Sequence, residues 1–226
     1  MNVLELLKSL EDLIFEVSTW VVLVPKTLLK VVRSPSWAST YVSMQAEQAS
    51  DDVYDDYVSP VVLWLTCSVL PYLWFVLALD VNERQGLETQ ALLVSVFLAS
   101  GPIGMATSFV LEKKQELTKK HLKYQFYVQC YIFSIFYMLL FPFLIRIMAD
   151  FPEIKFDMPI EQYVIIASSF LLALIWLCVA EVVTIKKELD CSMLKSMLLL
   201  LPMVFTSYMI FFVVFAIMQI AILVLK

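Results

Sequence analysis

The feature that most constrains this sequence is a series of long apolar runs that contain almost no charge. They lie at about 58–79, 89–111, 125–148, 162–185 and 196–225. A helix of about 20 apolar residues spans the hydrocarbon core of a bilayer. The chain is also 61% hydrophobic, well above the roughly 45–50% of a soluble domain. We therefore predict an all-α membrane protein, a polytopic helix bundle of about five spans.

The last apolar run, at about 196–225, is longer than one bilayer crossing needs. It contains Pro202, so we expect it either to tilt strongly or to begin as an interfacial turn before the proline. The residues ahead of the first run are more polar. The chain therefore divides into an N-terminal segment, 1–57, and a transmembrane domain, 58–226.

The N-terminal segment begins with an amphipathic pattern. In residues 3–24 apolar side chains recur every three or four positions, which predicts a helix that Pro25 interrupts. Such a helix either lies in the membrane interface, with its cations near lipid headgroups, or packs on the protein's own spans. In the first alternative, the residues that contact the membrane interface are Trp20, Lys26, Lys30 and Arg33. The polar, acidic stretch at 34–57 is expected to form a solvated loop or a short helix.

The distribution of cations predicts the orientation of the spans. With five spans, 12 of the 16 Lys and Arg residues fall on one side, in the N-terminal segment and in the loops after the second and fourth spans. Lys and Arg are enriched in cytoplasmic loops. We therefore predict a cytoplasmic N-terminus and a C-terminus on the opposite face.

Two features inside the spans suggest a path for a substrate or ion. Gly101, Pro102 and Gly104 could unwind the second span and expose backbone carbonyl groups, as the broken helices of transporters do, or could simply allow close helix approach. Glu181 is the deepest acidic residue, about one turn from Lys186 and Lys187, whose side chains can extend to the interface. An acid within a span is a functional candidate.

Motifs of enzymes are absent from the sequence. We find no nucleophile elbow, zinc-protease motif or phosphate-binding loop, and a single histidine, His121, lies in a basic loop. The four cysteines show no C-x-x-C spacing. We therefore predict no catalytic, cofactor-binding or metal-ligating residues, no cofactor, and no binding to nucleic acid.

The residues just before the first span, 55–60, resemble the Asp-Leu-Tyr-Gly-Pro motif of the Yip (Ypt-interacting-protein) family. Asp56, Tyr57 and Pro60 match it, whereas the glycine is missing. The resemblance implies a cytoplasmic N-terminus, five spans and a scaffolding or membrane-organising role. Bacterial members often open with an interfacial helix and a proline-containing stretch, to which 28–35 is similar. A bacterial inner membrane is therefore favoured over a eukaryotic endomembrane.

Three functions remain open from the sequence. The first is a non-enzymatic scaffold or sensor that works through helix-mediated assembly with itself or with a membrane-protein partner. The second is a transporter of small solutes or ions, or an oligomeric pore, including a triggered membrane-damaging effector. The third is a protein that binds or moves lipids. Membrane lipids are expected to contact the protein whichever of the three functions applies.

Overall fold

The protein is described by a computed structural model over residues 3–47, 56–78, 87–149 and 160–224. All regular secondary structure in these ranges is helical, which confirms the all-α prediction. The helices are α1 (Val3–Arg33), α2 (Trp37–Glu47), α3 (Pro60–Ala78), α4 (Leu87–Glu112), α5 (Lys119–Ala149), α6 (Ile160–Glu188) and α7 (Met193–Val224).

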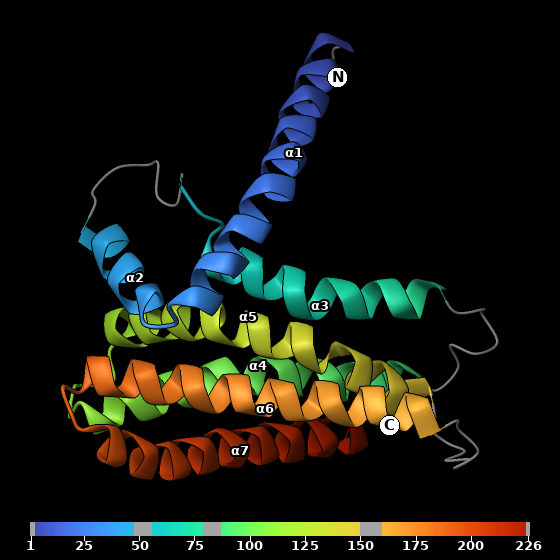
Figure 1. Ribbon diagram of the computed structural model, residues 1–226. Helices are drawn as coiled ribbons and strands as arrows, with labels where there is room; N and C mark the ends of the chain where they lie inside the picture. The colour runs from blue at the N-terminus through green and yellow to red at the C-terminus, as the bar shows by residue number, and fades with distance from the viewer. Residues whose placement is uncertain (1–2, 48–55, 79–86, 150–159, 225–226) are drawn as a thin grey trace.

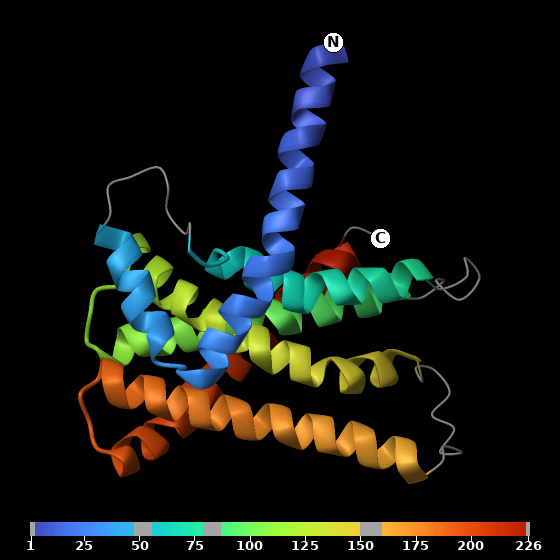
Figure 2. The same cartoon turned by 45° about the horizontal axis from the view of Figure 1, so that its top comes forward.

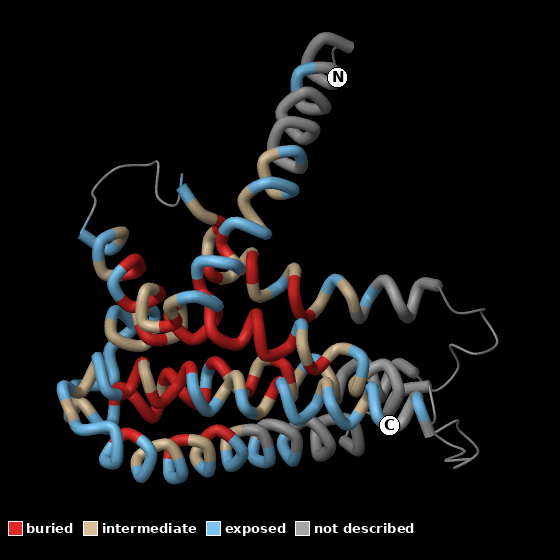
Figure 3. Tube along the Cα trace, viewed as in Figure 1, coloured by how far each residue is buried: buried red, intermediate tan, exposed pale blue. Residues whose placement is uncertain are grey.

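Helices α3 to α7 form a bundle with α5 at its centre (Figures 1 and 2). Helix α5 packs against α3, α4 and α6, and α7 completes the bundle against α4 and α6. Two hydrophobic clusters lie on different faces of α5. One joins it to α1, α2, α3 and part of α6, and the other joins it to α4, α6 and α7. The buried residues accordingly gather along α5, whereas the outer faces of α6 and α7 are exposed (Figure 3).

Four helices in the described residues are long and apolar enough to cross a membrane, which defines a multi-pass integral membrane protein. Their segments are Val94–Glu112, Lys119–Leu144, Val164–Glu188 and Met193–Ile210. The described part of α3 contains a shorter apolar segment, Pro60–Pro71, which does not reach the length of the other four. The fifth span therefore stays a prediction. Helix α7 continues through Pro202 without interruption, so no interfacial turn separates the residues before the proline from the rest.

The prediction that Pro25 interrupts the first helix was wrong. Helix α1 continues through Pro25 to Arg33. A proline inside a helix frees the carbonyl group four residues earlier, here that of Val21. Val21 and Pro25 are both exposed, so the interrupted turn lies on a face of α1 that the bundle does not cover. The far half of α1 extends away from the bundle at a steep angle, whereas its last turns pack on the core through Leu28 and Val31 (Figure 1).

The polar stretch after α1 forms a short helix, α2, and the acidic residues at 51–55 lie outside the described residues. One face of α2 is buried against α5, with Ala38, Tyr41 and Val42 in the core. Lys187 donates hydrogen bonds to the carbonyl oxygen of Ser36, at 2.8 Å, and to the hydroxyl group of Thr40. Helix α2 therefore belongs to the bundle and lies at the end where α4 meets α5 and α6 meets α7, which we term the loop end (Figure 1).

Candidate functional site

Glu181 lies in the interior of the bundle, on α6. Its side chain is 0% exposed. One carboxyl oxygen, Oε2, accepts a hydrogen bond from Gln129 Nε2 on α5 at 3.3 Å. The other, Oε1, has no hydrogen-bond partner among the described residues, and neither has Gln129 Oε1. Lys187 extends to α2 instead of toward this carboxyl group.

A line of polar side chains connects Glu181 to the loop end. Gln125 and Gln129 are four residues apart on α5, and Glu181 and Glu188 are seven apart on α6, so each pair shares one helix face. Gln125 Nε2 donates to Glu188 Oε2 at 3.4 Å, one step closer to the loop end than the Gln129–Glu181 bond. We call these four residues the polar seam. It runs between two spans, where uncharged contacts are the rule.

The outer end of the polar seam is closed by an ion pair. Lys113, just beyond α4, pairs with Glu188, whose side chain is 7% exposed. Tyr124 donates a hydrogen bond to Glu188 Oε1 at 2.9 Å, and its hydroxyl also lies 3.2 Å from the carbonyl oxygen of Ser39 on α2. Four helices therefore meet at this carboxyl group.

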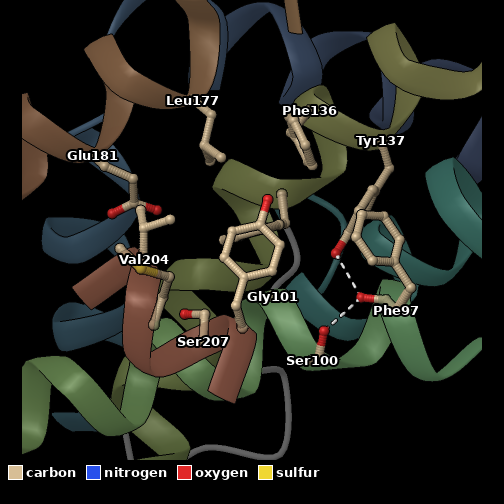
Figure 4. A pocket seen from close by; sticks show the side chains of 12 residues that line it. Phe97, Ser100, Gly101, Phe136, Tyr137, Leu177, Glu181, Val204 and Ser207 are labelled. Atoms are coloured by element: carbon tan, nitrogen blue, oxygen red, sulfur yellow. Dashed lines mark hydrogen bonds between the residues drawn. The ribbon is translucent and has the colours of Figure 1, made fainter. Parts of the chain in front are cut away.

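The inner end of the seam opens on a cavity of about 50 Å³ among α4, α5, α6 and α7, which we term the Glu181 cavity. Figure 4 shows the Glu181 carboxyl group facing the same space as Leu177, Val204 and Ser207. On the opposite wall, the hydroxyl groups of Tyr137 and Ser100 both donate to the carbonyl oxygen of Phe97, at 3.5 and 2.8 Å. Those two hydroxyl protons are therefore not free to bind a ligand, and Glu181 Oε1 is an acceptor without a partner among the described residues.

Aromatic rings form most of the remaining wall. Their centroids are close together: Phe133 lies 5.6 Å from Phe136 and 5.5 Å from Tyr137, and Phe97 lies 6.4 Å from Tyr137. Tyr208 of α7 adds a fifth ring. Aromatic faces carry partial negative charge and attract cations. One carboxyl group among several rings is an environment suited to a small cation.

Of the two alternatives for the second span, the structure contradicts the break, because α4 is a continuous helix from Leu87 to Glu112. The alternative, close helix approach, is what the glycines provide. A Cβ atom on Gly101 would lie 2.4 Å from the Phe133 ring, and one on Gly104 would lie 2.3 Å from Ser207 Cα. Gly101 lines the Glu181 cavity together with Glu181, whereas Pro102 and Gly104 are buried elsewhere on α4.

The residues of the family-like motif form the start of α3. Ser59 caps the helix, since its hydroxyl and carbonyl groups accept from the amides of Val62 and Leu63 at 3.4 and 2.9 Å, and Pro60 occupies the first helical position. Tyr57 packs edge-on against Trp37, with centroids 4.7 Å apart.

Lys26, one of the predicted membrane contacts, is exposed and also joins α1 to this motif. Its ammonium group donates to the carbonyl oxygen of Asp56 at 2.8 Å and lies 4.6 Å from the ring centre of Tyr57. Lys30 and Arg33 are exposed and Trp20 is half-buried, as an interfacial helix allows.

Gln129 is the site residue that the sequence analysis missed. It is uncharged and lies in an aromatic-rich span, where a single amide does not interrupt the apolar pattern. The signal was its spacing from Gln125, because two amides at a four-residue interval place polar groups on one face of a span. Ion and hydrogen-bond pairing inside a membrane needs such a partner.

The helix order, the apolar segments and the buried carboxyl group together define a multi-pass integral membrane protein with a polar interior site. In comparisons with protein-family models, curated proteins and solved structures, nothing matches this chain. The resemblance to the Yip family therefore stays a prediction that rests on Asp56, Tyr57, Pro60 and the helix layout.

Proposed function

We propose that this protein binds a small organic ammonium ion in the Glu181 cavity and belongs to the transporter class. The observation that carries the proposal is the Glu181 carboxyl group, which is completely buried and has one oxygen without a partner among the described residues. Ionisable groups inside a membrane are costly and mark substrate or ion pathways. The carboxyl group supplies the countercharge that a buried cation requires.

The lining distinguishes an ammonium ion from a bare metal ion. A metal ion of the alkali or alkaline-earth type is held by several oxygen ligands, whereas this wall is mainly apolar and five of its twelve lining residues are aromatic. An alkylammonium ion places its charge against Glu181 and its methyl groups against the aromatic faces.

The size of the cavity limits the occupant. A cavity of roughly 150 Å³ holds benzene, and the Glu181 cavity is about one third of that at about 50 Å³. We therefore expect an ion of the size of methylammonium. The polar seam supports transport because it offers hydrogen-bonding groups from the loop end to Glu181, although the ion pair of Lys113 and Glu188 closes it in the structure described.

Assembly with itself or with a membrane partner stays a prediction. The outer faces of α6 and α7 expose large apolar side chains such as Leu171, Leu198 and Phe205, but lipid tails solvate such a face as well as another helix does. We also regard the protein as non-enzymatic, with the loop end in the cytoplasm of a bacterial cell, on the strength of its cation distribution and its sequence motifs.

The test is calorimetric titration of methylammonium chloride into the full-length protein in nanodiscs at pH 7, with potassium chloride as the reference salt. We expect saturable heat from methylammonium alone, lost in Glu181→Gln. The substitution keeps the shape and the amide partner, so the fold should persist. Glu161→Gln removes an exposed acid from the same helix and should bind like the parent. Equal binding by both variants, or no methylammonium binding by the parent, would contradict the proposal.

A further inference from the structure

A second and larger cavity lies at the loop end, where the α5 span begins. Its volume is about 620 Å³, within the range of roughly 300–1,000 Å³ that small-molecule sites occupy. One wall is the helix α2, and the other is the connection from α4 to α5 with the first turns of α5. We term it the loop-end cavity. It is separate from the Glu181 cavity, with which it shares no lining residue.

The lining of the loop-end cavity is basic. Lys113, Lys120, Lys123 and His121 contribute to it, and no aspartate or glutamate does. Lys113 is neutralised by Glu188, and the Nδ1 atom of His121 lies 3.0 Å from the carbonyl oxygen of Glu116. Lys120 and Lys123 are exposed and keep their charge available to a ligand.

The start of α5 strengthens this positive field. The helix begins at Lys119, its first turn contains no acid, and Thr118 caps it by accepting from the amide of His121 at 3.3 Å. A helix N-terminus carries a partial positive charge and favours anions, so cations in the first turn are locally unfavourable. Such a local conflict is expected where function requires it. An anion in the cavity would resolve it.

The position of the cavity sets the kind of anion. Tyr124 and Tyr127 line it at the start of the α5 span, and aromatic residues of this kind lie at the level of lipid headgroups. The ammonium group of Lys123 is 5.4 Å from the ring centre of Tyr127, so the cationic and the interfacial residues coincide. The cavity therefore meets both the headgroup layer and the aqueous phase.

We propose that the loop-end cavity binds a phosphate-bearing anion, held by Lys120 and Lys123 at the N-terminus of α5 and enclosed by α2. The phosphate belongs either to the headgroup of an anionic phospholipid or to a soluble phosphate ester. The proposal does not rest on cation binding at Glu181, because the two cavities share no lining residue and differ in the sign of their charge.

Native mass spectrometry of the full-length protein tests the lipid source. The protein is released from nanodiscs that contain equal amounts of phosphatidylglycerol and phosphatidylcholine. Titration with glycerol 1-phosphate, followed by thermophoresis, tests the soluble source. The variant is Lys120→Gln with Lys123→Gln. The matched control is Lys186→Gln with Lys195→Gln, which removes two exposed lysines from the same end of the bundle but outside the cavity.

We expect the cavity variant to bind about 25-fold more weakly, because a lysine near an anionic group contributes about fivefold; the control should stay within about twofold of the parent. Selective retention of phosphatidylglycerol assigns a lipid headgroup, and glycerol phosphate binding without lipid preference assigns a soluble ester. An equal loss in both double variants would show a diffuse surface attraction and overturn the proposal. So would binding that neither variant weakens, or no phosphate binding by the parent.

Discussion

Replacement of Gly104 by alanine should force α4 and α7 apart. The added Cβ atom would lie 2.3 Å from Ser207 Cα and 2.6 Å from Ser207 Cβ and Oγ. The nearest of these atoms belongs to the backbone, so rotation of a side chain cannot relieve the contact. Ordinary contact begins at 3.4 Å, and the two helices must separate locally by about 1.1 Å.

Two effects of opposite sign set the size of the change. Overpacking of a tight contact costs typically about 1–3 kcal/mol, and a backbone clash belongs at the upper end. Alanine in place of glycine within a helix gains roughly 1 kcal/mol. The net destabilisation is therefore about 2 kcal/mol. At about 2–4 °C per kcal/mol for a chain of this size, the melting temperature should fall by about 4–8 °C.

Two buried thiols allow the thermal unfolding of the bundle to be followed directly. Cys67 and Cys130 are 7% and 0% exposed, so a thiol-reactive fluorophore labels them only as the bundle opens. The assay uses a Cys178→Ala, Cys191→Ala background, because Cys178 is exposed and Cys191 is partly exposed in the folded protein. All variants are heated at one rate, since unfolding of such a protein is expected to be irreversible and the midpoint depends on the rate.

Gly101→Ala is the informative comparison for this prediction. Its Cβ atom would meet the ring of Phe133 at 2.4 Å, which is a side chain and not a backbone. The ring must move by about 1.0 Å to restore ordinary contact at 3.4 Å, but a side chain can rotate without separating the helices, so we expect a smaller fall than for Gly104→Ala. A Gly104→Ala protein that melts at or above the parent temperature would refute the close approach of α4 and α7.

Two further predictions address the junction before α3 and the orientation. Tyr131→Phe removes the hydroxyl group that donates to the Val58 carbonyl oxygen at 2.8 Å in a buried position. The carbonyl oxygen left without this donor should lower the free energy of unfolding by about 1–3 kcal/mol. The thiol assay should show this as a lower melting temperature, and an unchanged melting temperature would contradict the prediction. Single cysteines at Lys119 and Lys195, in a chain without other cysteines, should both react with an impermeant maleimide only from the cytoplasmic side; labelling from outside would reverse the predicted orientation.

The spans could be predicted closely because the physical demand on them is simple. A run expected at about 89–111 proved to be α4, Leu87–Glu112, and one expected at about 162–185 proved to be α6, Ile160–Glu188. The hydrocarbon core requires a continuous apolar helix. A contiguous run of apolar residues therefore indicates a span without any knowledge of its tertiary contacts. The effect of Pro25 was mispredicted because a proline inside a helix removes one hydrogen bond but need not end the helix, and α1 continues past it to Arg33.

The interior site could be predicted only in part, because its parts come from separate helices. Glu181 is visible in the sequence as a charge in an apolar run. Its partner, Gln129, is 52 residues away, and no local pattern joins the two. The role of Gly101 could not be predicted either. A glycine next to a proline is compatible with an unwound helix and with a close helix contact. Only the structure shows that the ring of Phe133, on another helix, packs against Gly101.

Helix α5 explains why the two proposed sites lie on one structural axis. Its first turns supply the lysines of the loop-end cavity, Gln125 and Gln129 follow on the face that meets α6, and Phe133, Phe136 and Tyr137 then line the Glu181 cavity. Lys113 and Tyr124 belong to the loop-end cavity and also hold Glu188 at the mouth of the polar seam. An anion that draws Lys113 toward the cavity would weaken its ion pair with Glu188 and so act on the contact that closes the seam. The two sites can thus be tested by separate mutations, since Lys120 and Lys123 line the loop-end cavity and Glu181 lines the other cavity. Lys113 is the residue through which an anion in the loop-end cavity would affect the polar seam and the Glu181 cavity.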